Sequence, residues 1–320
     1  MDDAKSGTVT THPLLHLATA PANWNNNDIP GWRPLTPFPR VLDEMLAAGY
    51  GATEYDASFG RDDMVLRIEA SQRGMTWCGS YQWVDFLDAG TINASIQALE
   101  PTFTLLDGIG CRHLIVADSL RPHRVAMAGN VPVNGSQSLS RDQVQLIADS
   151  VHRLAEAAGH HDIAVHYHNH VGSWIETPDE VEALIDCLDF GAVDLCFDTG
   201  HYAYGGGDAA AFIREHHARI GYLHLKDVDP AVLAASRREG LTFIEALKRI
   251  VFSPIGEGAA DIPSILSVLT AHGFAGWIVV EQDTCAGDAT ATARANLDFI
   301  ARWLQRHTET MLSREGGHTR

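Results

Sequence analysis

The stretch Val193-Asp194-Leu195-Cys196-Phe197-Asp198-Thr199-Gly200-His201 decides the fold of this chain. Its apolar part is short and closes in Asp-Thr-Gly-His, which is typical of a buried strand that delivers polar groups into the loop at its C-terminal end. Three further apolar runs end in the same way, at Ile163–His168, Ile220–His224 and Trp277–Glu281. Segments with helical spacing separate these runs. Strands that alternate with helices and end in ionisable groups predict the catalytic face of a parallel α/β barrel.

The remainder of the chain supplies four more strand–helix units. We expect their strands at Leu14–Thr19, Ala52–Tyr55, Met75–Tyr81 and Arg112–Asp118. No linker or internal repeat interrupts the pattern, so the sequence predicts one domain, a single (β/α)8 TIM barrel. We place a disordered lead at residues 1–12, the barrel at residues 13–307 and a mobile tail at residues 308–320.

Two connections differ from an ordinary barrel loop. The segment Ser119–Ser138 is rich in Pro, Gly and Asn and is long, so we interpret it as a lid or an oligomer contact. The stretch from Asp227 to Glu257 reads as irregular, with one helix-like run at Phe243–Val251.

Composition excludes several classes of partner. The net charge of −18 argues against nucleic acid or an anionic membrane surface, because both require a basic footprint. No apolar run reaches the roughly 18 residues that a membrane span needs. The start of the chain lacks an apolar signal core, and the five cysteines form no CxxC pair. We therefore expect a cytoplasmic protein with reduced, packed cysteines.

The ionisable strand ends predict a metal site. Alternate residues of a strand share a face, so His168 aligns with His170, His224 with Lys226, and Glu281 with Asp283. The candidate ligands are His168, Asp198, His224 and Glu281. A lone strand-end His is more often a hydrogen-bonded core residue, but four ionisable ends on one side of a barrel are costly to bury without a cation. Two imidazoles and two carboxylates suit Mn²⁺ or Co²⁺, with Zn²⁺ or Fe²⁺ as alternatives, better than Mg²⁺ or Ca²⁺.

The order of these motifs resembles a known family. The sequence is similar to the sugar-phosphate isomerase/epimerase-like barrels of the xylose isomerase-like superfamily. The likeness lies in five motifs that follow one another along the chain: the strand-five ligand, Asp-Thr-Gly-His, His-x-Lys-Asp, Gly256-Glu257-Gly258 and Val-Val-Glu. Within it, His168-Asn169-His170-Val171-Gly172 looks like the His-His-His-Met-Gly of inosose (2-keto-myo-inositol) dehydratases. The segment from Pro21 to Asp28 and the pair Thr53-Glu54 also resemble that branch. The likeness extends from Leu14 to Asp283.

The resemblance implies that Asp198, His224 and Glu281 are metal ligands. Epimerases of the superfamily carry Glu at the end of strand five, and two facing Glu residues exchange the substrate proton between them. This chain has His168 there, which can still bind a metal but does not support a symmetric exchange between two Glu residues.

These residues predict a metal-dependent lyase that removes water from a small keto-polyol or keto-sugar. One group takes the proton beside the ketone, and another protonates the departing hydroxyl. We expect His170 or His201 to transfer protons, with Glu281 as a possible base. Lys226 either stabilises the developing oxyanion or forms a salt bridge to Asp227 or another carboxylate. Candidate hydroxyl contacts are Trp24, Glu54, Tyr81 and Asp118, for which local capping or packing is an equal alternative.

Three alternatives stay open. Related barrels eliminate the aglycone from 3-keto-glycosides by the same proton abstraction, and the sequence does not separate that leaving group from hydroxide. A ketose isomerase or epimerase fits the superfamily but not His168. A non-enzymatic sugar-binding subunit fits the barrel but not the complete ligand set. The resemblance also implies a homo-oligomer.

Overall fold

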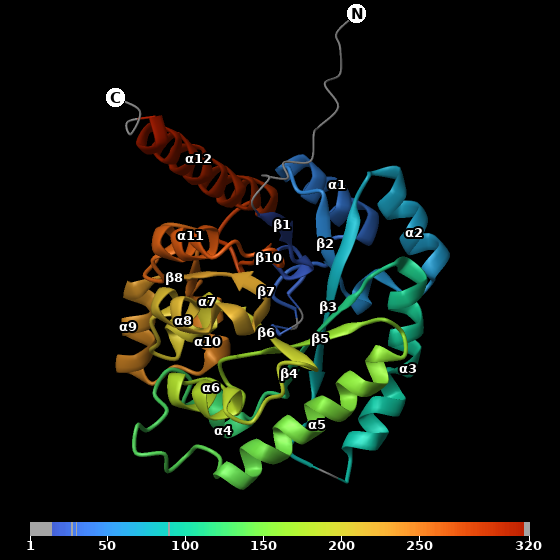
Figure 1. Ribbon diagram of the computed structural model, residues 1–320, viewed down its shortest axis with the longest axis vertical. Helices are drawn as coiled ribbons and strands as arrows, with labels where there is room; N and C mark the ends of the chain where they lie inside the picture. Colours follow the sequence, from blue (N-terminus) through green and yellow to red (C-terminus); the bar gives the residue numbers. More distant parts are fainter. Residues whose placement is uncertain (1–14, 27, 30, 89, 317–320) are drawn as a thin grey trace, which may run out of the picture.

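The computed structural model describes residues 15–26, 28–29, 31–88 and 90–316, and its centre is a closed barrel of parallel strands (Figure 1). The strands neighbour one another in the order β1-β10-β7-β6-β5-β4-β3-β2. Their bounds are β1 His16–Thr19, β2 Ala52–Tyr55, β3 Thr76–Val84, β4 His113–Asp118, β5 Ala164–His168, β6 Val193–Asp198, β7 Ile220–Leu225 and β10 Trp277–Val280. The predicted single (β/α)8 TIM barrel is confirmed.

Helices enclose the barrel on its outer side (Figure 1). They are α1 Phe38–Ala48, α2 Asp63–Gln72, α3 Ile92–Ile109, α5 Arg141–Gly159, α6 Pro178–Ile185, α8 Ala209–His216, α11 Ile262–Ala271 and α12 Ala289–Gly316. Helix α5 shows how each one docks. Its buried residues recur at helical spacing and form one apolar stripe, Val144, Ile147, Ala148, Val151 and Leu154. Burying each large aliphatic side chain of such a stripe contributes about 1.5–3 kcal/mol.

The helix starts follow local sequence signals. Ser140 and Gln143 form a capping box at the start of α5, and Thr177 and Glu180 form another at α6, with Pro178 at the first helical position. Each box satisfies backbone N–H groups that the first turn leaves without a partner. Local sequence thus determines where α5 and α6 begin.

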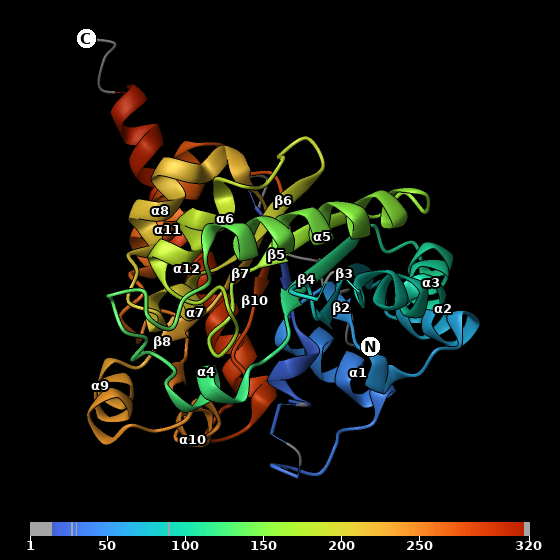
Figure 2. The same ribbon diagram turned by 90° about the horizontal axis from the view of Figure 1, so that it is seen from below.

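A second layer covers the C-terminal ends of the strands. Figure 2 shows α4, α9 and α10 gathered at one end of the barrel. This layer consists of α4 Pro122–Ala126, the antiparallel pair β8 Asp227–Val228 and β9 Phe252–Ser253, α9 Pro230–Glu239 and α10 Phe243–Lys248. It has its own apolar cluster, which includes Val171, Tyr204, Phe243, Leu247 and Phe252. Phe243 and Phe252 of this layer pack against the rings of His170 and His201.

The stretch that we expected to be irregular is ordered, and Asp227 is the reason. Its Oδ1 accepts from the backbone N–H groups of Val228 and Ala260, and its Oδ2 accepts from those of Gly256 and Gly258. A Cβ at Gly258 would lie 2.3 Å from Asp227 Oδ1. Gly258 is thus required so that the backbone can approach this carboxylate.

Two strand and helix ends also differ from expectation. Strand β3 continues past Tyr81 to Val84, because its last five residues pair with β4 from Leu114 to Asp118. Helix α12 continues past the expected barrel boundary at residue 307 to Gly316, so residues 308–316 are helical. The predicted lead at residues 1–12 lies outside the described residues, as do residues 317–320. In the described part of the chain no helix has the length and apolar character to cross a membrane.

Candidate active site and metal centre

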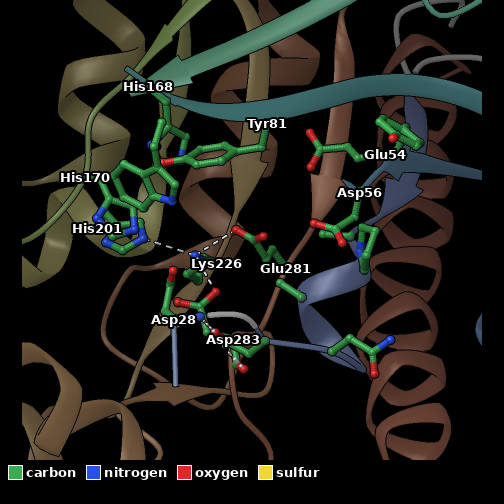
Figure 3. Close-up of a pocket in the computed structure, with 17 residues that line it drawn as sticks. Asp28, Glu54, Asp56, Tyr81, His168, His170, His201, Lys226, Glu281 and Asp283 are labelled. Carbon is green, nitrogen blue, oxygen red and sulfur yellow. Dashed lines mark hydrogen bonds and ion pairs between the residues drawn. The ribbon is translucent and has the colours of Figure 1, made fainter. Parts of the chain in front are cut away.

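The strand register places the predicted ligands at one end of the barrel. Asp198, the last residue of β6, lies beside His224 of β7, and Glu281 directly follows β10. His168 ends β5 beside Cys196. A cavity of about 170 Å³ opens above these residues (Figure 3). Of the residues proposed from the sequence, Glu54, Tyr81, His168, His170, His201, Lys226 and Glu281 line it.

The ligand atoms converge with spacings that suit a metal. Asp198 Oδ2 lies 3.3 Å from His168 Nε2 and 3.8 Å from His224 Nδ1, and His224 Nδ1 lies 3.3 Å from Glu281 Oε2. A tetrahedral site with bonds of about 2.1 Å separates its ligand atoms by roughly 3.4 Å. His168 Nε2, Asp198 Oδ2 and His224 Nδ1 are buried and make no hydrogen bond. Such atoms are costly to bury unless an ion satisfies them, so these residues fit a divalent metal.

Glu54 orients one of the ligands. Its Oε1 lies 3.0 Å from His224 Nε2 and accepts a hydrogen bond from Tyr222 Oη at 3.0 Å. A carboxylate accepts only, so His224 Nε2 carries a proton and Nδ1 is the ring nitrogen that faces the ligand cluster. This carboxylate–histidine arrangement is the usual support of a metal ligand. Glu54 was predicted to contact substrate hydroxyls, and the geometry adds this orienting role.

Lys226 lies among carboxylates at the floor of the cavity. Its Nζ is 2.7 Å from Glu281 Oε2, 2.9 Å from Asp283 Oδ1 and 3.3 Å from Asp198 Oδ2 (Figure 3). Burial lowers the pKa of Lys226, but these carboxylates outweigh burial and hold the pKa well above its ordinary value. Burial raises the pKa of Glu281, and Lys226 and His224 reverse the effect and hold it well below its ordinary value. Lys226 is therefore a cation beside the ligand cluster, paired with carboxylates other than Asp227.

His170 and His201 form a close pair at the wall of the cavity, with ring centroids 3.7 Å apart and ring planes tilted by 38°. His170 Nδ1 lies 2.7 Å from the carbonyl oxygen of Val171, which can only accept, so the proton is on Nδ1 and Nε2 is basic. His201 Nδ1 accepts from the backbone N–H of Val171, and its Nε2 faces Lys226 Nζ at 3.2 Å. Burial holds the pKa of both imidazoles well below the ordinary value. Both rings are therefore neutral near pH 7.

Two predicted substrate contacts lie elsewhere. Trp24 is buried and donates its indole N–H to Glu44 at 2.9 Å, which anchors the loop after β1 on α1. Asp118 ends β4 and pairs with Arg121 at 3.1 Å. Neither residue lines the cavity. Both geometries correspond to the packing and capping alternatives.

The cavity also contains residues that we did not propose from the sequence. They include Asn26, Asp28, Asp56, Trp83 and Asp283. Burial raises the pKa of Asp283 to about 7 and that of Asp28 to about 6. Asp283 shares a strand face with Glu281, so alternation pointed to it. Trp83 was missed because the expected strand ended at Tyr81, two residues before it.

Comparisons with known proteins agree with this architecture. Residues 42–303 match the Xylose isomerase-like TIM barrel family. The chain belongs to that family. It is 32% identical over 290 residues to the rhizopine catabolism protein MocC of Rhizobium meliloti, which covers 90% of this chain and 88% of the relative. It is 31% identical over 300 residues to an inosose dehydratase of Geobacillus kaustophilus (strain HTA426), which covers 92% of this chain and 96% of the relative.

A solved structure of the IOLI protein with a bound zinc atom has the same fold. Its TM-score is 0.64 at 14% identity, and the match covers 90% of this chain and 99% of that one. The predicted membership of the superfamily is confirmed by the family match.

Proposed function

We propose that this protein is a divalent-metal-dependent dehydratase that removes water from a small keto-polyol, of the 2-keto-myo-inositol type. One observation carries the proposal. Three buried ligand atoms without hydrogen bonds lie together on His168, Asp198 and His224, and His168 also lines a cavity that contains two neutral imidazoles. The names of the relatives that match over most of the chain support the substrate class, since one is an inosose dehydratase.

The donor set determines which group would be bound. His168, Asp198, His224 and Glu281 would hold the metal, and their mixture of nitrogen and oxygen suits Mn²⁺ or Co²⁺, with Zn²⁺ or Fe²⁺ as alternatives. When bound, the ion acts as a Lewis acid that polarises the ketone and acidifies the neighbouring C–H.

The proton transfers belong to the histidines, and Lys226 supplies positive charge. His170 Nε2 takes the proton from the carbon beside the ketone, because its Nδ1 proton is already committed to Val171. The C–O bond on the next carbon then breaks, and the leaving hydroxide receives this proton back from His170 and departs as water, with His201 as the alternative proton carrier. Lys226 stays protonated and compensates the negative charge that develops on the ketone oxygen. Glu281 remains an alternative base.

The proposed function is tested by metal analysis of the purified protein together with an assay of 2-keto-myo-inositol. We expect about one metal ion per chain and a product that has lost one water. Chelation should abolish turnover, and added Mn²⁺ or Co²⁺ should restore it. No metal and no turnover would refute the mechanism.

Product analysis in deuterated water separates the alternatives. An epimerase returns a product of unchanged composition that carries deuterium at the exchanged carbon, whereas a dehydratase gives the dehydrated diketone. Release of an aglycone from a 3-keto-glycoside, without action on 2-keto-myo-inositol, would move the assignment to the eliminase.

A further inference from the structure

A buried carboxylate outside the cavity connects to His170 through one peptide unit. Glu176 is 1% exposed, and its Oε2 accepts a hydrogen bond of 2.8 Å from the backbone N–H of Gly172. That N–H belongs to the same peptide unit as the carbonyl of Val171, which lies 2.7 Å from His170 Nδ1. The order of contacts is therefore carboxylate, peptide, imidazole, and the far imidazole nitrogen faces the cavity.

The two hydrogen bonds of this peptide unit reinforce each other. A carboxylate on the N–H side polarises the amide and makes its carbonyl oxygen a better acceptor. A better acceptor holds the Nδ1–H of His170 more firmly and keeps the lone pair on Nε2. A carboxylate in direct contact with a histidine has the same effect in many enzymes, and here the Val171–Gly172 peptide stands between the two groups.

The segment at residues 119–138 explains why Glu176 is held in place. Glu176 Oε1 accepts from the N–H of Gly129, and Gly172 O accepts from the N–H of Arg121. Arg124 is fully buried, makes a bidentate pair with Glu180 at 2.8 and 2.7 Å, and lies 3.8 Å from Glu176. This segment thus fastens the loop that carries His170 to the rest of the barrel.

We propose that Glu176 is a positioning residue that acts through the Val171–Gly172 peptide to hold His170 in the tautomer with its proton on Nδ1. The long segment at residues 119–138 contributes to this role, because the N–H of Gly129 is one of the two N–H groups that hold the carboxylate. The effect on turnover rests on the proposed function of His170 as the base. The tautomer itself does not.

The test is ¹⁵N NMR of histidine-labelled protein at pH 8, with His170 assigned by its disappearance in His170→Gln. Glu176 is ionised at this pH, because burial raises its pKa only to about 7. We expect His170 of the wild type to be protonated on Nδ1. In Glu176→Gln the amide provides one oxygen for two N–H groups and turns its NH₂ toward the other, so His170 should lose its single tautomer. For 2-keto-myo-inositol we expect kcat to fall roughly 10- to 100-fold with KM within about twofold.

Thr177→Ala is the matched control. It removes the N-cap of α6, one residue away, and leaves the contact between Glu176 and Gly172 in place. We expect this control to be less stable than the wild type but to keep the Nδ1–H tautomer and kcat. Glu176→Asp should recover less than the wild type, because the shorter side chain cannot reach both N–H groups.

Two outcomes would overturn the inference. One is a wild-type His170 protonated on Nε2, a result that does not depend on whether the Glu176 variants fold. The other is a Glu176→Gln protein in which kcat falls while the tautomer is unchanged. If the wild type does not act on 2-keto-myo-inositol, the proposed function fails, and the spectra still decide the role of Glu176.

Discussion

Replacing Glu54 by Gln should weaken metal binding without removing a metal ligand. Glu54 Oε1 contacts His224 Nε2 and Tyr222 Oη, each at 3.0 Å, and all three side chains are buried. Gln keeps an oxygen at this position but loses the negative charge. A proton and a divalent metal compete for His224 Nδ1. The negative charge of a nearby carboxylate attracts the doubly charged metal ion more strongly than the singly charged proton. The variant should therefore lose affinity for the metal.

The expected loss can be estimated in two ways. Outer carboxylates that support a metal-binding histidine typically change metal affinity about 10- to 100-fold, or about 1.4–2.7 kcal/mol. A hydrogen bond to a charged group contributes roughly 1.5–3 kcal/mol when it is buried. Both estimates describe the bond between His224 and Glu54, and they agree.

The assay is calorimetric titration of metal-free protein with Mn²⁺ and with Zn²⁺. Asp118→Asn is the matched control, because Asp118 is also a buried carboxylate at a strand end but pairs with Arg121 instead of a histidine. We expect the control to bind metal like the wild type. Equal affinity of Glu54→Gln and the wild type would refute the orienting role of Glu54, and equal losses in both variants would point to a general loss of barrel structure.

Three further predictions concern turnover and stability. Lys226→Met should lower kcat for 2-keto-myo-inositol about 10²- to 10³-fold, as expected for loss of a group that stabilises developing charge; an unchanged kcat would leave Lys226 a structural cation. Asp227→Asn turns an NH₂ toward two backbone N–H groups and should lower the free energy of unfolding by about 3 kcal/mol. Thermal unfolding should show a Tm lower by several degrees, and a Tm equal to that of the wild type would contradict this expectation. Burial raises the pKa of Glu176 from 4.5 to about 7, so folded protein keeps this proton in a range where the unfolded chain releases it. Between pH 4.5 and 7 the unfolding free energy of the wild type should therefore fall by about 3 kcal/mol more than that of Glu176→Gln. Urea denaturation across this pH range measures the difference. Parallel pH profiles of the two proteins would exclude a contribution from Glu176.

Most of the barrel could be predicted because its strands are short apolar runs between amphipathic helices. Runs such as Trp277–Val280 are buried on both faces, and their periodicity needs no long-range information. The cover layer could not be predicted in the same way. The strand pair β8–β9 has two residues per strand and is ordered by Asp227, which accepts from three N–H groups about 30 residues later in the chain. No local pattern records such a contact.

The candidate site followed from strand alternation, and the exceptions followed from loops. His168, Asp198 and His224 were found because a strand end fixes where a side chain points. Trp24 lies in the loop after β1, whose path depends on α1. Its residue type alone suggested a contact with substrate hydroxyls. In the structure its indole N–H donates to Glu44 instead. Glu176 gave no signal, because its function depends on a peptide four residues earlier in the chain.

The three strands that supply most of the site share one arrangement, in which a ligand is followed two residues later by a group that carries or holds a proton. The pairs are His168 with His170, His224 with Lys226, and Glu281 with Asp283. In each pair the first member lies at or next to the end of its strand, and the second lies two residues farther along the chain, beyond the strand end. Under the proposed function, the same three strand ends therefore supply both the metal ligands and the groups that carry protons. Glu281 Oε2 belongs to both sets of contacts, because it faces His224 Nδ1 and Lys226 Nζ. A metal held by these ligands would therefore be coupled through this oxygen to the charge of Lys226.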